Sequence, residues 1–299
     1  MRNAFIHELV ALAEKNKNIV LIVGDLGFSV IEPFVERFPD RFINAGVAEQ
    51  NMMGLAAGMA SEGCHVFVYS IANFPTFRCA EQIRNDVDYH KLPVTVVAVG
   101  GGMGYGNLGY SHHAIQDYAL IRSMPNMLIA APGDPFEVRA CMKYLINNPQ
   151  PSYLRLGKAG EPNMNLEIPT IFPGKWNKIG KKTSMEVKRK AILSTGATLE
   201  IAVNLSKQSE FSEYEVFSMP LWGQSYKVLQ KELAVNFDEI ITIEDHLLDG
   251  GFGSWMMESL SFHSLANLIK PRALSSDVCG MVGTQKSLNE FGGLLNIIS

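Results

Sequence analysis

Short hydrophobic runs alternate with longer amphipathic segments through the first half of the chain. The runs are rich in Val and Ile and end at Gly, Pro, Ser or Asp, so they predict parallel strands buried on both faces. The segments between them repeat apolar residues about every 3.6 positions, which predicts helices. This alternation is typical of an α/β fold, with helices on both faces of a parallel sheet. The runs cover residues 19–25, 65–70, 94–100 and 127–132, and the helical segments cover 48–63, 77–89 and 135–148.

A stretch rich in Pro and Lys separates this half from a second set of elements. Residues 161–188 show little periodicity, and we interpret them as an interdomain linker whose lysines are solvated. The chain is therefore predicted to have one domain over residues 1–160 and a smaller α/β domain over 189–299. In the second domain the predicted strands cover 190–196, 214–219 and 239–245, and the predicted helices cover 197–209 and 225–236.

Composition narrows the class of protein. A chain of 299 residues with 47% hydrophobic and 19% charged residues is typical of a folded globular protein. The net charge of −4 gives no positive field to attract nucleic acid. The amphipathic N-terminal segment does not fit a signal peptide, and the uncharged stretch 92–116 is too interrupted by Pro and Gly to span a membrane. Four widely spaced cysteines predict reduced thiols in a cytoplasmic protein.

Glu49 is the one charged residue between Arg41 and Glu62, and it opens the predicted helix 48–63. Within that helix Gly54 and Gly58 each cost about 1 kcal/mol relative to Ala, so we expect a backbone or a subunit to approach closely. Two interpretations of the acid remain open from the residues alone. It is a first-turn carboxylate stabilised by the helix dipole, or an acid kept poorly hydrated so that it shares a proton with a ligand.

The segment around this acid resembles the pyrimidine-binding (Pyr) domain of the transketolase family of thiamine diphosphate enzymes. The resemblance is carried by RFINAGVAEQNMMGLAAGMASEG, YSIANFPTFRCAEQIRND, KLPVTVVAV, GNLGYSHHAIQDYALIRSMPNMLIAAPGDPFEVR and PSYLRLGK. Near the C-terminus, EIITIEDHLLDGGFGS resembles the third domain of the same proteins. The similarity therefore extends over nearly the whole chain.

The resemblance implies a cofactor role for four residues. Glu49 matches the family glutamate that hydrogen-bonds N1′ of the aminopyrimidine and favours the imino tautomer, whose 4′ nitrogen acts as the base on the thiazolium C2. Phe74 and Phe77 match aromatic side chains that flank the pyrimidine, although two Phe at this spacing also fit a hydrophobic core. Asp25 matches an aspartate that lies near the thiamine.

Substrate contacts are implied for four further positions. Ser29 and Arg2 match phosphate-binding residues, although Arg2 equally fits a surface charge near a chain end. His112 follows a Gly-rich loop and matches the histidine that hydrogen-bonds substrate oxygens in the active site. Lys158 falls near the family arginine for the sugar-phosphate terminus, where Lys lacks the bidentate fork of Arg.

Two positions depart from the family pattern. Leu108 stands where the family has an aspartate that reads the C2 hydroxyl of the acceptor, and Gly100 stands where transketolases have a histidine. A site without a hydrogen-bond partner for a hydroxyl does not select for that hydroxyl. We therefore expect an unusual acceptor, and the sequence identifies neither the donor nor the acceptor.

The family holds the cofactor diphosphate through Mg²⁺ (or Ca²⁺) with a GDG…N motif in a separate PP domain, and this chain has only GDL at 24–26 and GDP at 133–135. No metal ligand is therefore predicted here. We expect a second polypeptide to supply the PP domain in an α2β2 assembly, with this chain inactive alone. The predicted activity is that of a split transketolase, a transferase that moves a two-carbon ketol unit from a ketose phosphate to an aldehyde acceptor.

Other readings stay open. The E1 β subunit of a 2-oxoacid dehydrogenase and a deoxyxylulose-phosphate-synthase-like enzyme share this domain arrangement, and a non-catalytic partner subunit is a third possibility. The sequence GYGNLG at 104–109 matches a nicotinamide-binding fingerprint in letters, but four residues separate it from its strand and no helix pattern follows. In the C-terminal domain, GGFGS at 250–254 fits either an anion site or a packing turn, and His246 has no predicted role.

Overall fold

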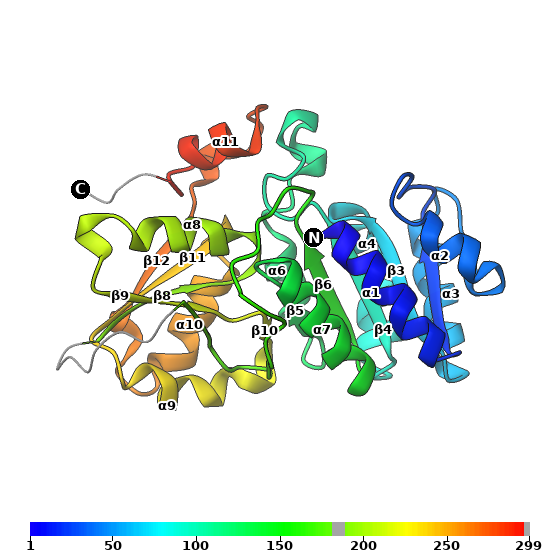
Figure 1. The fold of residues 1–299 in the computed structure, drawn as a ribbon, viewed down its shortest axis with the longest axis horizontal. Helices are drawn as coiled ribbons and strands as arrows, with labels where there is room; N and C mark the ends of the chain where they lie inside the picture. The colour runs from blue at the N-terminus through cyan, green and yellow to red at the C-terminus, as the bar shows by residue number, and fades with distance from the viewer. Residues whose placement is uncertain (181–188, 296–299) are drawn as a thin grey trace.

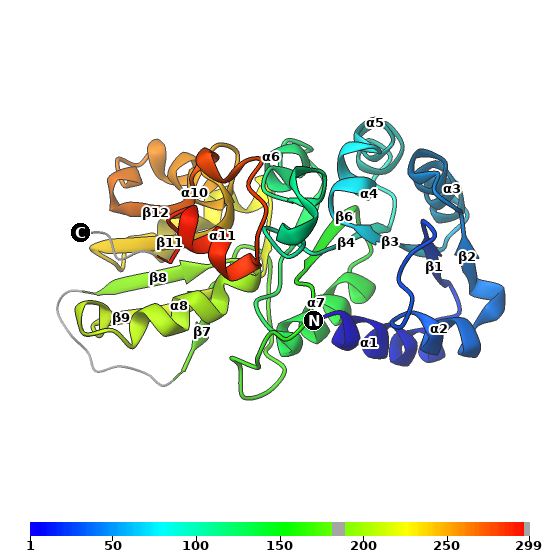
Figure 2. The same ribbon diagram turned by 90° about the horizontal axis from the view of Figure 1, so that it is seen from above.

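The computed structural model describes residues 1–180 and 189–295 of the chain. Two sheets lie side by side and each is flanked by helices (Figure 1). Helices α1, α2 and α7 cover one face of the first sheet, and α3, α4 and α5 cover the other (Figure 2). These helices are α1 (Arg2–Lys15), α2 (Glu32–Arg37), α3 (Glu49–Ser61), α4 (Asn73–Phe77), α5 (Ala80–Gln82) and α7 (Pro135–Asn147), and the short α6 (Asp117–Ile121) packs against α4.

The first sheet has seven strands in the order β10-β5-β6-β4-β3-β1-β2. Six strands are parallel, and β10 runs antiparallel to β5. Every residue of β1, β4 and β6 is buried, and burial on both faces explains why β1 and β4 are almost entirely apolar in sequence. The predicted α/β fold with a parallel sheet is confirmed. The strands are β1 (Ile19–Val23), β2 (Phe42–Asn44), β3 (His65–Ile71), β4 (Val94–Val99), β5 (Leu128–Ala130), β6 (Ser152–Leu156) and β10 (Leu221–Trp222).

The second sheet has five strands in the order β12-β11-β8-β9-β7. Its edge strand β7 lies inside the predicted linker, of which residues 181–188 lie outside the described residues, and the domain boundaries stay a prediction. The strands are β7 (Asn177–Ile179), β8 (Lys190–Ser194), β9 (Tyr214–Ser218), β11 (Glu239–Leu247) and β12 (Ile269–Leu274). The helices are α8 (Leu199–Ser206), α9 (Gln230–Ala234), α10 (Phe252–Ser261) and α11 (Gln285–Phe291).

The predicted helix 77–89 is not continuous. The chain forms α4, then the single turn α5, and then a π-helical segment, Ile83–Asp88. A π-helical turn accommodates one extra residue, so the side-chain positions drift relative to the α-helical pattern that the sequence suggested. This break was not visible in the apolar spacing.

The glycine-rich turn before α10 is a packing turn with an internal carboxylate at the helix start. Glu244 is buried and accepts hydrogen bonds from the backbone N–H groups of Phe252, at 2.5 Å, and Gly253, at 2.7 Å. Burial raises the pKa of Glu244 to about 8, although these two hydrogen bonds oppose the shift. The N-terminal amides of α10 are therefore already satisfied within the chain, and the packing-turn interpretation is the one the structure supports.

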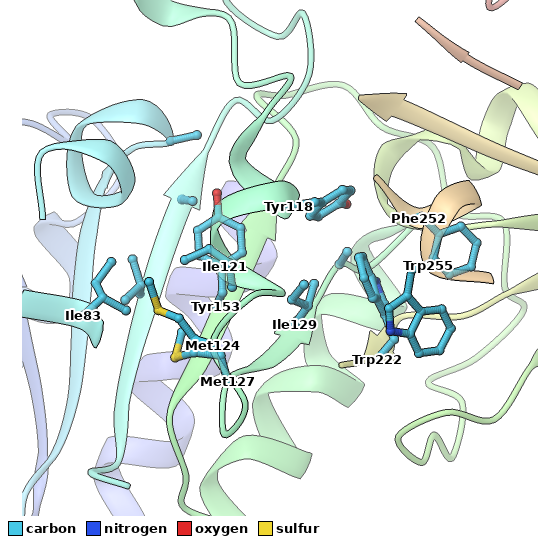
Figure 3. Close-up of a cluster of buried hydrophobic side chains, with 14 of the residues drawn as sticks. Ile83, Tyr118, Ile121, Met124, Met127, Ile129, Tyr153, Trp222, Phe252 and Trp255 are labelled. Carbon is cyan, nitrogen blue, oxygen red and sulfur yellow. The ribbon is translucent and has the colours of Figure 1, made fainter. Parts of the chain in front are cut away.

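Aromatic side chains from β10, α6 and α10 form a continuous core. Trp222 on β10 has its ring centroid 5.1 Å from Tyr118, 5.3 Å from Phe252 and 5.4 Å from Trp255. Figure 3 shows these side chains between the two sheets, beside the residues packed under the first sheet. Since β10 follows β9 in sequence but pairs with β5, the second half of the chain completes the first sheet.

One buried arginine joins the two halves by hydrogen bonds. Arg155 on β6 donates from Nε to Asp117 Oδ2 at 2.7 Å and from Nη1 to Asp245 Oδ1 at 2.5 Å. It also donates from Nη2 to the carbonyl of Ala114 at 2.8 Å. All three charged side chains are at most 2% exposed, so the charges are compensated by one another rather than by water.

Replacing Arg155 with Met should leave two carboxylates buried without their cation. We expect the free energy of unfolding to fall by about 3–5 kcal/mol, measured by urea denaturation at pH 7. Arg37→Met is the matched control because the Arg37–Glu14 pair is exposed at both ends, and it should cost less than about 1 kcal/mol. Equal stability of the two variants would show that the buried triad is not needed to hold the halves together.

Burial of His246 should make the free energy of unfolding fall at acid pH. Burial lowers the pKa of His246 to about 4, while Asp117 Oδ1, 3.9 Å from Nε2, opposes this shift. Because the unfolded pKa is about 6.5, the unfolded chain binds this proton first, and stability falls as the pH drops from 6.5 through 4. His246→Gln should reduce that fall by up to about 3 kcal/mol, whereas the exposed His263→Gln should not. Parallel stability–pH curves for wild type and His246→Gln would refute this.

Candidate functional site

The residues that the sequence singled out follow the carboxyl ends of the parallel strands. In an open α/β sheet this edge is where loops meet and ligands bind. Because these strands are parallel, the residues that follow their carboxyl ends lie at the same edge of the sheet. Asp25 follows β1, Glu49 follows β2, Phe74 and Phe77 follow β3, His112 follows β4 and Lys158 follows β6.

Glu49 is buried and paired with a cation that the sequence analysis did not foresee. It is the first residue of α3 and is 5% exposed. Arg78 Nη1 donates to Glu49 Oε1 at 2.8 Å, and the Arg78 side chain is half exposed. Arg78 lies four residues after Phe74, on the same side of that helical segment, which was the available signal.

An aromatic row continues from this ion pair. The guanidinium carbon of Arg78 lies 4.3 Å from the ring centroid of Phe74. The ring of His112 meets Phe74 edge-on, with centroids 5.2 Å apart. Burial, together with the neighbouring His113 and Arg78, lowers the pKa of His112. Three of the predicted residues are therefore in one contiguous group with Arg78.

A cavity of about 490 Å³ opens beside this row. Its aromatic side includes Phe74 and Phe77, and the Phe77 side chain is exposed toward solvent. Among the described residues, the buried Oδ1 of Asn73 has no hydrogen-bond partner. The cavity is lined by Asn73, Phe74, Phe77, Arg78, Tyr110, Ser111 and Gln116.

A cationic group lies at the other end of the row. Lys158 Nζ is 4.8 Å from the ring centroid of Tyr105, and that ring is 6.3 Å from the ring of His112. Arg2 Nε donates to the carbonyl of Lys158 at 2.5 Å. The structure thus brings Arg2 and Lys158 together and connects them to His112 through Tyr105.

Tyr105 was missed because its position depends on a glycine. Gly100 has φ +79°, and a side chain there would collide with the Tyr105 ring. Burial raises the pKa of Tyr105, against the effect of Arg2. The Tyr105 ring therefore takes the space that a side chain at position 100 would need, whereas Leu108 is half exposed on the same loop.

Asp25 and Ser29 lie on a separate loop. Asp25 has φ 55°, its backbone N–H donates to Asn44 Oδ1, and Asn44 Nδ2 donates to Asp25 Oδ1, both at 3.0 Å. Ser29 has φ 65°, and its backbone N–H donates to Glu32 Oε1 at 2.7 Å. None of the described hydrogen bonds or ring contacts joins Ser29 to the row around Phe74.

The arrangement offers a flat aromatic wall with a buried acid at one end and two cations at the other. Such a set is suited to a planar heterocycle and an anionic ligand. Among the described residues there is no group of three or more His, Cys, Asp or Glu that could hold a metal ion. The described helices are all too short or too polar to cross a membrane.

Comparison with known proteins identifies the family. The profile of the family described as "Transketolase, pyrimidine binding domain" matches residues 1–161. One of the subunits of apulose-4-phosphate transketolase from Phocaeicola vulgatus is 32% identical over 87% of this chain and 83% of its own length. A 1-deoxy-D-xylulose-5-phosphate synthase of Clostridium perfringens is 33% identical over 87% of this chain, which is 42% of its own length.

The solved structure of a split gene transketolase, an inactive beta4 tetramer, matches with a TM-score of 0.85 and 32% identity. The match covers 98% of this chain and 93% of that one. The chain therefore belongs to the transketolase family, and along nearly its whole length it resembles the subunit of a split transketolase that carries the Pyr and C-terminal domains.

Asn73 positions the loop that carries His112. Its Nδ2 donates to the carbonyls of Ser111, at 3.1 Å, and His113, at 2.9 Å. Asn73→Ala should lower the free energy of unfolding by about 1–3 kcal/mol and speed hydrogen exchange of the amides of 110–113. The matched control is Asn148→Ala, which removes one exposed bond to Tyr144 and should leave that loop unchanged. Unaltered exchange in the Asn73 variant would contradict the positioning role.

Proposed function

We propose that this chain is the C-terminal subunit of a split transketolase. With thiamine diphosphate and a partner chain it transfers a two-carbon ketol unit from a ketose phosphate to an aldehyde acceptor. The observation that carries the proposal is the buried carboxylate of Glu49, which accepts a hydrogen bond from Arg78, whose guanidinium lies over the ring of Phe74. Phe74 and Arg78 line a cavity of about 490 Å³. The names of two relatives, a split gene transketolase and a transketolase subunit, support the reaction class.

The residues present fit the aminopyrimidine of the cofactor. Phe74 and Phe77 would flank a flat ring, and Glu49 would hydrogen-bond its N1′ nitrogen. The unpaired Oδ1 of Asn73 is an acceptor at the same cavity. This chain therefore offers the aminopyrimidine ring two flanking aromatic side chains, the carboxyl group of Glu49 and the free acceptor of Asn73.

Thiamine diphosphate, when bound, supplies a carbanion at C2 that accepts and releases the two-carbon unit. The role of Glu49 is to hold a proton that it shares with the ring nitrogen, and its burial keeps water from competing. Phe74 and Phe77 orient the ring. His112 is held by Ser111, whose Oγ lies 2.9 Å from Nδ1, so its Nε2 is available for a substrate oxygen.

Arg2 and Lys158 would bind the phosphate of the sugar. Lys158 lies next to Tyr105, at the end of the row away from Glu49, and Arg2 is hydrogen-bonded to the Lys158 backbone. Asp25, on the loop after β1, would lie near the thiamine, and Ser29 would reach the substrate phosphate from the same loop.

We propose that the diphosphate is held, through Mg²⁺ or Ca²⁺, by a separate PP-domain chain in an α2β2 assembly. Gly54 and Gly58 are exposed on α3, and no atom of the described chain comes within 4 Å of where their Cβ atoms would lie. The close approach that these glycines permit is therefore left to another subunit. The inactivity of the related beta4 tetramer supports the need for a second kind of chain.

A deoxyxylulose-phosphate-synthase-like reaction is the second candidate, because one such synthase is 33% identical to this chain. The two candidates differ in the donor, which is a ketose phosphate for ketol transfer and a 2-oxoacid for the synthase. A 2-oxoacid dehydrogenase E1 β subunit would also take a 2-oxoacid. Incubating the reconstituted complex with each donor and identifying the products separates them.

Glu49→Gln is the direct test of the proposal. In the complex with a PP-domain partner, turnover should fall by about 100-fold or more, because Gln cannot share a proton with the ring nitrogen. Glu62→Gln, an exposed acid at the end of the same helix, should retain full activity. Steady-state kinetics with thiamine diphosphate and Mg²⁺ present give the comparison.

Full activity of the Glu49 variant would remove the cofactor role and favour a non-catalytic subunit. The isolated chain is the companion measurement, and it should show no turnover and weak cofactor binding. Turnover by that chain alone would contradict the requirement for a partner.

A further inference from the structure

Arg78 occupies the two contacts that a bound pyrimidine would need. Its flat guanidinium lies 4.3 Å from the centroid of Phe74, and its Nη1 donates to Glu49 Oε1 at 2.8 Å. A planar group stacked on the phenyl ring and bonded to the acid is also the description of the proposed ligand. Arg78 thus satisfies the acid with atoms of the protein itself.

We propose that Arg78 closes the pyrimidine position in the ligand-free chain and must leave Glu49 when thiamine diphosphate binds. This inference rests on the proposed function. It makes Arg78 a gating residue of the cofactor site, one that sets the affinity for the cofactor without taking part in the chemistry.

Physical arguments favour this occupant. A buried carboxylate without a donor is costly, and Arg78 provides a charge-assisted hydrogen bond to Glu49. The planar guanidinium is also attracted to the face of Phe74. The pair stabilises the empty site, since water reaches Glu49 poorly.

The Arg78 side chain can move into solvent when it leaves Glu49. It is half exposed and lines the cavity of about 490 Å³ together with Tyr110, Ser111 and Gln116. The cation can therefore return to water along a long flexible stem, with no movement of the backbone. Glu49 has no such freedom, because it is fixed in the first turn of α3.

A ligand that binds only the open arrangement has its apparent affinity reduced by the fraction of open molecules. Removing the guanidinium should therefore tighten binding. We expect R78M, in the complex with its PP-domain partner, to bind thiamine diphosphate about tenfold more tightly than wild type. The dissociation constants are measured by isothermal titration calorimetry with Mg²⁺ present.

Matched variants isolate the effect. R84M removes a nearby exposed arginine that bonds only to Asn85 in the described structure, and it should leave affinity unchanged. R78K keeps the charge but lacks the planar fork, and its affinity should lie between wild type and R78M. In the E49Q background the guanidinium has lost its ionised partner, so adding R78M should change affinity by about twofold or less.

The outcomes distinguish this inference from the proposed function. If R78M binds the cofactor as weakly as wild type or more weakly, Arg78 supports Glu49 in the bound state too, and the gating inference fails. The proposed function then still stands on the loss caused by E49Q. If E49Q in the complex turns over as fast as wild type, the proposed function itself fails.

Discussion

A guanidinium buried between two carboxylates determines how the two halves of this molecule fit together. Arg155 sits on β6 of the first sheet, Asp117 begins α6, and Asp245 lies on β11 of the second sheet. These three side chains are shielded from water, so each charge is stabilised by the others and not by solvent. Because Arg155 also holds the carbonyl of Ala114, the same interaction fixes the end of the loop that carries His112. The second sheet therefore contributes to the geometry of a site built on the first.

The candidate site shows the same principle on a smaller scale. Glu49 is also buried, but its cation, Arg78, is half exposed and can be released to water. A permanent pairing suits a structural junction, whereas a reversible one suits a place where a ligand must enter. Burial of the acid and exposure of its partner together distinguish these two cases.

The sequence was informative where one physical signal dominated. Fully buried strands such as β1 and β4 stand out as apolar runs, and the unusual isolation of Glu49 was visible without any structure. The strands β2 and β10 were missed because two or three residues are too few to show an alternating or apolar pattern. Strand β6 was missed because Arg155 interrupts its apolar pattern. The resemblance supplied Arg2, Phe74, His112 and Lys158. The spacing of Arg78 from Phe74 was the one local signal for Arg78, whereas its pairing with Glu49 and the place of Tyr105 depend on tertiary contacts.

The two-residue strand β10 has a consequence for how the chain can be divided. It returns from the second half to lie antiparallel along β5, so that a strand of two residues, and not β5, forms the edge on that side of the first sheet. Trp222 extends from it into the shared aromatic core. Uncovered edges of this kind invite pairing between separate molecules. The first half is therefore protected from self-association by a piece of the second, and the two are better regarded as one folding unit than as separable modules.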